Sequence, residues 1–285
     1  MPTAILVCRL LLGLALQPGP AAWDTVAATL KSVPTITAEY RRFAFPRTDL
    51  SVVIGDVPVA AGIALGGWVG FVGGPDDAMV IGDLVVLPSE LPAVTGILAS
   101  RGIGMTAVHN HLARETPAVL YVHIVGTGRA VTLAAAIDAA LSATAILRPA
   151  RVNPPQPPQL DTAMVFSALG VRGRASGPLV NLSAQLVAGP IRVDGRDLPA
   201  NLAAASPINL QQVSPVRVVA TGDFALLSAR APAVVTTLER SGIAVTAIHS
   251  HYLASEPALV FVHFWADGPL ADVLRGLRAG IDAGR

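Results

Sequence analysis

Short hydrophobic runs follow one another along the chain, and their spacing switches between a two-residue period and a helical one. Residues 36–45 ("ITAEYRRFAF") and 50–59 ("LSVVIGDVPV") alternate as strands do, with turn residues between them. The segment "GDLVVL", which begins at Gly82, predicts a further strand. Just upstream, "GGWVGFVGGPDD" is typical of a glycine-rich turn region. Much of this part of the chain is therefore expected to form a sheet.

Helical spacing occurs before, between and after these strands. "WDTVAATLKS" predicts an opening helix with Asp24 near its start, and "SELPAVTGILAS" predicts a helix that ends at Gly102. In chain order, the predicted helices and the β-rich runs between them cover 23–32, 89–100, 104–112, 118–125 and 129–142. This order predicts an α+β unit, in which helices pack on one face of a largely antiparallel sheet.

The second half of the chain repeats the first. Residues 82–123 align with 222–263 at a constant offset of 140, without gaps and with 17 identities in 42 positions. Between the copies, "RPARVNPPQPPQ" favours an extended spacer. The predicted organisation is a leader over 1–22, a first repeat over 23–147, a proline-rich linker over 148–159 and a second repeat over 160–285. Because both repeats are apolar, we expect them to pack together as a pseudo-symmetric pair.

Composition narrows the classes of function. The 285 residues carry a net charge of +1, and only 14% of them are charged, so neither a nucleic-acid-binding face nor an acidic tail is predicted. The chain has no Gly-x-Ser-x-Gly motif, and "VGTGRAV" lacks the third glycine of a dinucleotide fingerprint. No segment after residue 22 predicts a transmembrane helix. The expected partners are a metal ion or a small molecule.

The N-terminal segment "AILVCRLLLGLALQPGPAA" has the apolar run and the small-residue end of a secretory signal peptide. No Lys or Arg precedes the run and Arg9 interrupts it, so the alternative is an apolar N-terminal helix of a cytoplasmic protein. We expect an exported protein, periplasmic or associated with the cell envelope. Cys8 is the only cysteine, so neither an intramolecular disulfide nor a cysteine-based zinc site is predicted.

All the histidines lie in two equivalent stretches, "TAVHNHLARETPAVLYVH" (106–123) and "TAIHSHYLASEPALVFVH" (246–263). A strand places side chains two residues apart on one face. If the two β-rich runs of the first copy form a hairpin with His109 opposite His123, all three imidazoles of that copy share this face. The candidate ligands are His109, His111 and His123 in the first copy and His249, His251 and His263 in the second.

Three convergent imidazoles predict a site for a divalent metal, with zinc as the expected ion. Zinc accepts histidine nitrogens, and three of them with an open water position form a catalytic pattern, which carbonic anhydrase shares as ligand geometry only. The alternative is that the histidines are polar groups that form hydrogen bonds within the sheet. Their retention in both copies, while neighbouring residues differ, favours the metal site.

Glu115 lies in the predicted turn between the two β-rich runs. It is a candidate fourth ligand, a candidate general base and hence catalytic residue, or a solvated turn residue. The second copy has Ser255 at this position and Glu256 one residue later. If both copies bind a metal, we therefore predict that the first site is the stronger; the alternatives are two equivalent sites or one site that the six histidines share.

Four segments resemble one bacterial family. "FPRTDLSVVIGDVPVAAGIALGGWVGF", "AMVIGDLVVL", "GIGMTAVHNHLARETPAVLYVHI" and "IHSHYLASEPALVFVHFW" resemble the LppY/LpqO-type lipoprotein family, a domain-of-unknown-function family, over nearly the whole mature chain. The resemblance implies an exported, duplicated protein and brings no catalytic assignment. The chain departs from the family pattern at Ser250 and Ser255. Around Cys8, Val7 and Arg9 make a poor lipid-attachment box, which argues against a lipid anchor.

Two hypotheses of function follow. The first is an exported metalloprotein with hydrolytic or hydration chemistry at an open coordination position. The second is a non-enzymatic protein that binds a metal or a small ligand, or that uses the histidine face for interactions in the cell envelope. An enzyme requires a concave pocket at the histidines with a position left open, whereas a storage or structural site closes its shell of ligands.

Overall fold

The computed structural model describes residues 20–150 and 154–285, so Cys8 and nearly all of the predicted leader lie outside the described residues. In the part that is described, no helix is both long and apolar enough to cross a membrane. The first repeat contains α1 (Pro20–Leu30), β1 (Thr35–Ile36), β2 (Tyr40–Pro46), β3 (Val52–Ile54), β4 (Val57–Val59), α2 (Ala61–Ala64), β5 (Gly66–Gly74), β6 (Asp77–Val86), α3 (Leu91–Ser100), β7 (Gly104–His109), β8 (Glu115–Thr116), β9 (Leu120–Gly128) and α4 (Ala130–Leu141). The second contains α5 (Thr162–Leu169), β10 (Gly173–Ser176), β11 (Leu179–Gln185), β12 (Ile191–Val193), β13 (Arg196–Leu198), α6 (Ala200–Ala203), β14 (Ala205–Ser214), β15 (Arg217–Leu227), a 3₁₀ turn (Ser228–Arg230), α7 (Ala231–Arg240), β16 (Ala244–His249), β17 (Leu259–Gly268) and α8 (Leu270–Gly284).

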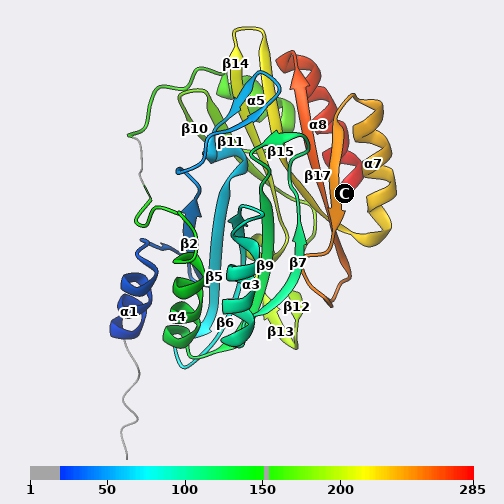
Figure 1. The fold of residues 1–285 in the computed structure, drawn as a ribbon. Coiled ribbons are helices and arrows are strands. Elements are labelled where there is room, and N and C mark those ends of the chain that lie inside the picture. Colours follow the sequence, from blue (N-terminus) through cyan, green and yellow to red (C-terminus); the bar gives the residue numbers. More distant parts are fainter. Residues whose placement is uncertain (1–19, 151–153) are drawn as a thin grey trace, which may run out of the picture.

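Each repeat forms one six-stranded antiparallel sheet (Figure 1). The strand order is β1-β2-β5-β6-β9-β7 in the first repeat and β10-β11-β14-β15-β17-β16 in the second, so the two topologies are the same. In both sheets the histidines come from the last two strands of this order and from the loop after the edge strand. The predicted α+β class, with two tandem repeats built on antiparallel sheets, is confirmed.

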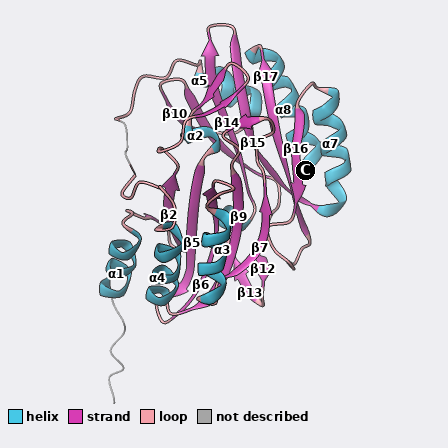
Figure 2. Ribbon diagram, in the orientation of Figure 1, coloured by secondary structure: helices cyan, strands magenta, loops and turns pink. Residues whose placement is uncertain are grey.

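Helices cover the outer face of each sheet, and the sheets lie between the two helical layers (Figure 2). On β6, Val80 and Leu84 face α3 and α4, whereas Met79 and Ile81 face the second repeat. Both faces of β6 are buried, which explains why its sequence, "DAMVIGDLVV", is a nearly continuous apolar run. The inner faces of the two sheets therefore form the boundary between the repeats.

Two apolar clusters join the repeats across this boundary. In one, the β3–β4 hairpin and α2 of the first repeat pack against Val219 and Trp265 of the second sheet. In the other, the β12–β13 hairpin and α6 of the second repeat pack against Met79 and Ile81 of the first sheet. Each repeat thus covers part of the inner face of the other, in the pseudo-symmetric arrangement that the sequence predicts.

Two ion pairs at the hairpin tips bridge the same boundary. Asp56 lies 2.7 Å from Arg217, and Asp77 lies 2.5 Å from Arg196. Asp77 and Arg217 are the first residues of the equivalent strands β6 and β15, so the charge at this position is reversed between the copies. Such exposed pairs add little to stability, but their signs favour the pairing of unlike repeats over the pairing of two first repeats.

The glycine-rich segment 66–77 is mainly the central strand β5, and only its end, at Pro75 and Asp76, forms the turn that the sequence predicts. A Cβ atom on Gly70 would lie 2.7 Å from Leu202 Cδ1 of the second repeat, and one on Gly82 would lie 2.5 Å from the Trp68 carbonyl oxygen of the neighbouring strand. Glycine at these positions permits the close approach of a neighbouring strand and of the other repeat. Gly70 and Gly82 therefore lie where the packing is tight and not where the chain changes direction.

Residues 23–147 expressed alone are expected to dimerise or aggregate, because the inner face of the first sheet would otherwise face water. A dimer of first repeats would bring Asp56 and Asp77 of one copy near those of the other, so added salt should strengthen it. Size-exclusion chromatography with light scattering at low and high salt measures this, with the full chain as the control. A stable, soluble monomer would contradict the prediction.

Candidate metal centre

Strands β7 and β9 place the histidines of the first copy on the inner face of the sheet, in a register two residues from the predicted one. Ala107 lies opposite His123, and His109 lies opposite Tyr121, whereas the prediction paired His109 with His123. A shift of two residues keeps every side chain on its face, so the histidines still converge. The connection over 110–119 is longer than a tight turn because its segment β8 pairs with β3.

The histidines of the two copies meet in one group between the sheets, here called the histidine cluster. Ring centroids lie 3.6 Å apart for His109 and His249, 3.9 Å for His111 and His263, and 3.8 Å for His123 and His251. Each of these contacts joins one repeat to the other. The six predicted ligands therefore lie together between the repeats, and the ranking of a stronger first site stays a prediction.

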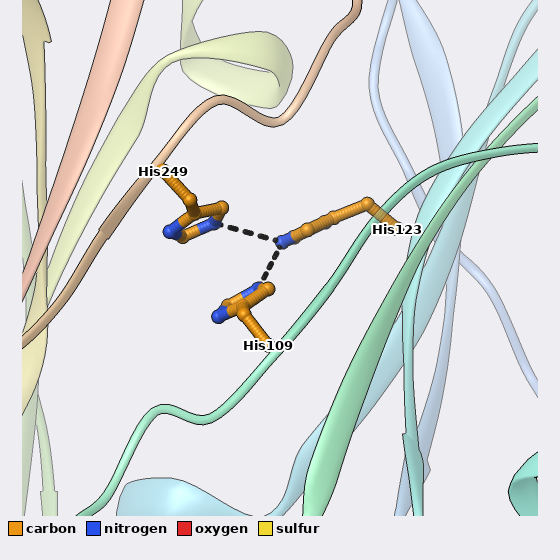
Figure 3. A group of neighbouring side chains, drawn as sticks. All are labelled: His109, His123 and His249. Carbon is orange, nitrogen blue, oxygen red and sulfur yellow. Dashed lines mark hydrogen bonds between the residues drawn. The ribbon is translucent and has the colours of Figure 1, made fainter.

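Three ring nitrogens point toward one place in this cluster (Figure 3). The Nε2 atom of His123 lies 2.8 Å from Nε2 of His109 and 3.2 Å from Nε2 of His249. Tetrahedral ligands at 2.0–2.1 Å from zinc are about 3.3 Å apart, so small adjustments would let these three nitrogens share an ion. A trio that combines both repeats is thus a candidate ligand set.

Polar contacts between the repeats fix the loops that carry two of the histidines. The Thr106 hydroxyl donates to the carbonyl oxygen of His251, and the Thr246 hydroxyl donates to that of His111, each over 2.5 Å. The Asn110 amide donates to the Thr246 carbonyl oxygen over 3.2 Å. These bonds hold the edge strands β7 and β16 together, which agrees with a structural role for Asn110.

Two aspartates not predicted as site residues lie against the histidines. Asp83 and Asp223 occupy equivalent positions on β6 and β15, and both are buried. The shortest separations are 3.6 Å from Asp83 Oδ2 to His111 Nε2, 3.8 Å from Asp83 Oδ1 to His123 Nδ1, and 3.8 Å from Asp223 Oδ2 to Nε2 of both His251 and His263. The signal was present in the sequence, because both copies retain a Gly-Asp pair within an apolar strand.

Glu115 has a different environment. Its Oε1 atom accepts a hydrogen bond from the Val119 backbone N–H over 3.2 Å. Among the described residues, no group of mutually close ligand atoms includes Glu115. In the second copy, the Ser255 hydroxyl donates to the Pro257 carbonyl oxygen. The catalytic role of Glu115 stays a prediction, and the carboxylates within the histidine cluster are those of the two aspartates.

The donor atoms of the cluster are suited to a cation. Four groups of three residues each bring one ligand atom per residue within 4.8 Å of the others. The groups are His109–His123–His249, His109–His111–His263, His249–His251–His263 and Asp83–His111–His123. Imidazole nitrogens with a carboxylate oxygen suit zinc, and also copper, iron or nickel.

Buried polar atoms without a hydrogen-bond partner concentrate at the same place. Within 20–150 and 154–285 they are Asp83 Oδ1, His111 Nε2, Tyr121 OH, Gln212 Oε1, Asp223 Oδ1, His249 Nδ1, His251 Nε2 and His263 Nε2. All except the Gln212 oxygen belong to the histidine cluster, its two aspartates or Tyr121, which stacks on His111. Buried polar atoms normally have a partner, so this concentration fits a bound cation and its water.

Burial sets the protonation of the cluster. It lowers the pKa of His109 to about 4 and that of His249 to about 3, and it also lowers the pKa of the other four histidines well below the usual value. Burial also raises the pKa of Asp223 to about 8 and raises that of Asp83. At neutral pH the imidazoles are therefore neutral and able to bind a metal, whereas a cation must displace protons from the carboxyl groups.

One side of the cluster opens into a cavity of about 640 Å³ between the repeats. This volume lies in the range of about 300–1,000 Å³ that is typical of small-molecule sites. Its lining includes Asp83, Asp223, His111, His251 and His263. The cavity is also lined by Tyr121 and Phe261, whose rings stack on His111 and His251. Of the candidate ligands, His111, His251 and His263 thus face an open cavity, whereas His109, His123 and His249 do not line it.

Comparisons with known proteins place both repeats in one family. A family model described as Domain of Unknown Function (DUF1259) matches residues 24–143 and 163–283. No curated protein matches the sequence. Among solved structures, the crystal structure of EtuB from Clostridium kluyveri aligns over 89% of this chain and 90% of that chain, with 10% identity and a TM-score of 0.22. A TM-score this low carries no argument about the fold.

Acidification from pH 6.5 to about 4 is expected to destabilise the metal-free protein. Histidines in the unfolded chain titrate near 6.5, whereas the pKa of His109 is lowered to about 4 and that of His249 to about 3. In this window the unfolded chain binds more protons, so the free energy of unfolding falls as the pH falls. Asp223 acts in the opposite direction, since its pKa of about 8 in the folded protein stabilises the fold at low pH and this contribution is lost as the pH rises through that value.

Melting temperatures in the presence of a chelator, measured across this pH range, test the prediction. The His109→Asn/His249→Asn double variant serves as the control, because it removes the two histidines whose pKa values are lowered to about 4 and about 3, and it should lose less stability on acidification. A melting temperature that stays constant from pH 6.5 to 4 would show that the cluster does not titrate in this way.

Proposed function

This chain belongs to the family described as Domain of Unknown Function (DUF1259), and on that premise we propose that its histidine cluster binds a divalent transition metal, with zinc as the expected ion. The metal would serve hydrolysis or hydration of a small molecule in the cavity. One observation carries the proposal: Asp83, His111 and His263 have buried atoms without a partner among the described residues, and the same side chains line the cavity. A storage site would enclose its ligands in protein instead.

The residues divide into ligands and groups that orient them. The six histidines and two aspartates supply nitrogen and oxygen donors. The Gly222 carbonyl oxygen lies 3.3 Å from His263 Nδ1, and the backbone of Gly82 hydrogen-bonds His123, so both rings are oriented by the strands that carry the aspartates. When bound, a divalent cation would act as a Lewis acid and lower the pKa of a water molecule.

Glu115 remains our candidate proton acceptor. Burial raises the pKa of the Tyr121 phenol, and the negative charges of Asp83 and Glu115 raise it further, so the Glu115 carboxylate lies within electrostatic reach of a cavity-lining side chain. The non-enzymatic alternative is a protein that binds a small ligand at the metal without transforming it. The cavity supports both activities and argues against simple metal storage.

We also propose export, together with the finer LppY/LpqO-type lipoprotein assignment. What supports them is the apolar leader over 1–22 and the sequence resemblance of the repeats. Fractionation of cells that express the native gene, with N-terminal sequencing of the mature chain, tests the export. An uncleaved chain in the cytoplasmic fraction would overturn it.

The protein purified without a histidine tag is expected to contain zinc or another divalent transition metal, nearer to one or two ions per chain than to none. Neutral imidazoles at neutral pH favour such binding because no proton must leave them. Elemental analysis by mass spectrometry measures the content, and a zinc titration at pH 7.5 follows on chelated protein. A metal-free preparation that also fails to bind zinc would show that the histidines are polar groups of the interface.

Matched variants separate a shared site from two unequal sites. His111→Ala and His251→Ala are expected to weaken zinc binding by similar factors, of about 10–100 or more, because the two residues occupy equivalent positions in one cluster. Glu256→Gln is the control, since this side chain is exposed and lies beside Arg192, away from the cluster. A loss confined to His111→Ala would restore the predicted ranking of two separate sites.

A further inference from the structure

The two walls of the cavity carry their arginines at different positions, although they come from equivalent strands: Arg42 lies opposite Thr35, whereas Asn181 lies opposite Arg174. Arg42 is the third residue of the seven-residue strand β2, and Asn181 is the third residue of the seven-residue strand β11. Both line the cavity. The pseudo-symmetric position thus carries a guanidinium group in the first repeat and a neutral amide in the second.

Arg42 is held in place while its hydrogen-bond donors remain available. Its Cζ atom lies 4.7 Å from the ring centroid of Trp68, which also lines the cavity. Stacking on an indole fixes the plane of the guanidinium and leaves its N–H edge open. Among the described residues the side chain forms no hydrogen bond and no salt bridge; burial lowers its pKa, and the charges of Tyr40 and Asp83 act in the opposite direction. A guanidinium held in this way can receive a bidentate anion.

The equivalent side chain on the other wall is already engaged. The Asn181 amide donates to the Gly62 carbonyl oxygen and to Asn209 Oδ1, each over 2.8 Å. These bonds join β11 to α2 of the first repeat and to the neighbouring strand β14. A second cation, Arg174, is exposed and also lines the cavity, so it adds positive potential there.

The aspartates at the base of the cavity do not oppose an anion under working conditions. As metal ligands, Asp83 and Asp223 would be neutralised by the cation, and in the metal-free protein burial favours their neutral forms. Arg42 keeps its charge at any physiological pH. A ligand that enters the cavity therefore meets the stacked guanidinium of Arg42 on one wall, the exposed Arg174 on the other and the metal centre at the base.

We propose that the cavity binds a small organic anion, a carboxylate or a phosphate monoester, with its acidic group on Arg42 and its apolar body against Trp68. The reacting part of the molecule then lies toward His111 and His251. This inference rests on the proposed function for the identity of the centre, but recognition of the anion by Arg42 is measurable by itself.

The strand offers a matched control for the test. Arg41 stacks on Trp23, with 4.4 Å from Cζ to the ring centroid, so it forms the same type of pair as Arg42 but does not line the cavity. Arg42→Gln and Arg41→Gln are compared with the wild type, each with its zinc content measured. The probes are benzoate and phenyl phosphate, with benzamide as the neutral counterpart of benzoate, and isothermal titration calorimetry gives the affinities.

We expect benzoate, phenyl phosphate or both to bind the zinc-loaded wild type, and to bind more tightly than benzamide does. Arg42→Gln should weaken anion binding by about 10-fold or more at unchanged zinc content, because a charge-assisted hydrogen bond is lost. Arg41→Gln should leave the affinity unchanged. The comparison of the two anions identifies the acidic group that the cavity prefers.

Two results would overturn the inference. One is equal anion affinity in Arg42→Gln and the wild type at equal zinc content, and the other is no binding of either anion to the wild type at millimolar concentrations. Both measurements can also be made on wild-type protein without zinc, so a failure of the metal proposal is distinguishable from a failure of anion recognition by Arg42. If only the metal proposal fails, the wild type contains no zinc, and Arg42→Gln still weakens anion binding to the metal-free chain.

Discussion

The packing of two sheets, inner face against inner face, is the constraint on which the rest of this structure depends. The inner face of each sheet combines apolar residues with buried histidines and an aspartate, and the other repeat covers part of it. The apolar clusters on either side, built by hairpins that cross from one repeat to the other, hold these polar groups out of water. Unpaired buried groups are costly, so such a cluster persists only where its surroundings are well packed.

The sequence predicts the elements that local pattern controls. Alternation of apolar and polar residues identifies β2 and the β3–β4 hairpin, and the gap-free match of 82–123 to 222–263 reveals the duplication. The shared face of His109 and His123 is also predictable, because an error of two residues in register leaves a side chain on its face. These inferences depend on the period of a strand and not on its neighbours in space.

The sequence does not show which distant residues pack against each face of a strand. Gly70 reads as a turn residue until Leu202 of the other repeat is seen against it. Glu115 stands near the histidines in the sequence and is drawn away by the pairing of β8 with β3, whereas Asp83 is distant in sequence and lies against His111. The union of six histidines follows from tertiary packing alone, since each copy by itself predicts a complete set of three.

A centre on a pseudo-two-fold axis has the geometry of a homodimer whose subunits became one chain. In a homodimer, any substitution near the axis appears twice, so a guanidinium on one wall of a central cavity would be matched by a second one on the opposite wall. Covalent joining of the halves removes this restriction, and each wall can then change independently. The equivalent positions Arg42 and Asn181 show the result: covalent joining has let the two walls of one symmetric centre place their charged groups at different distances from the axis.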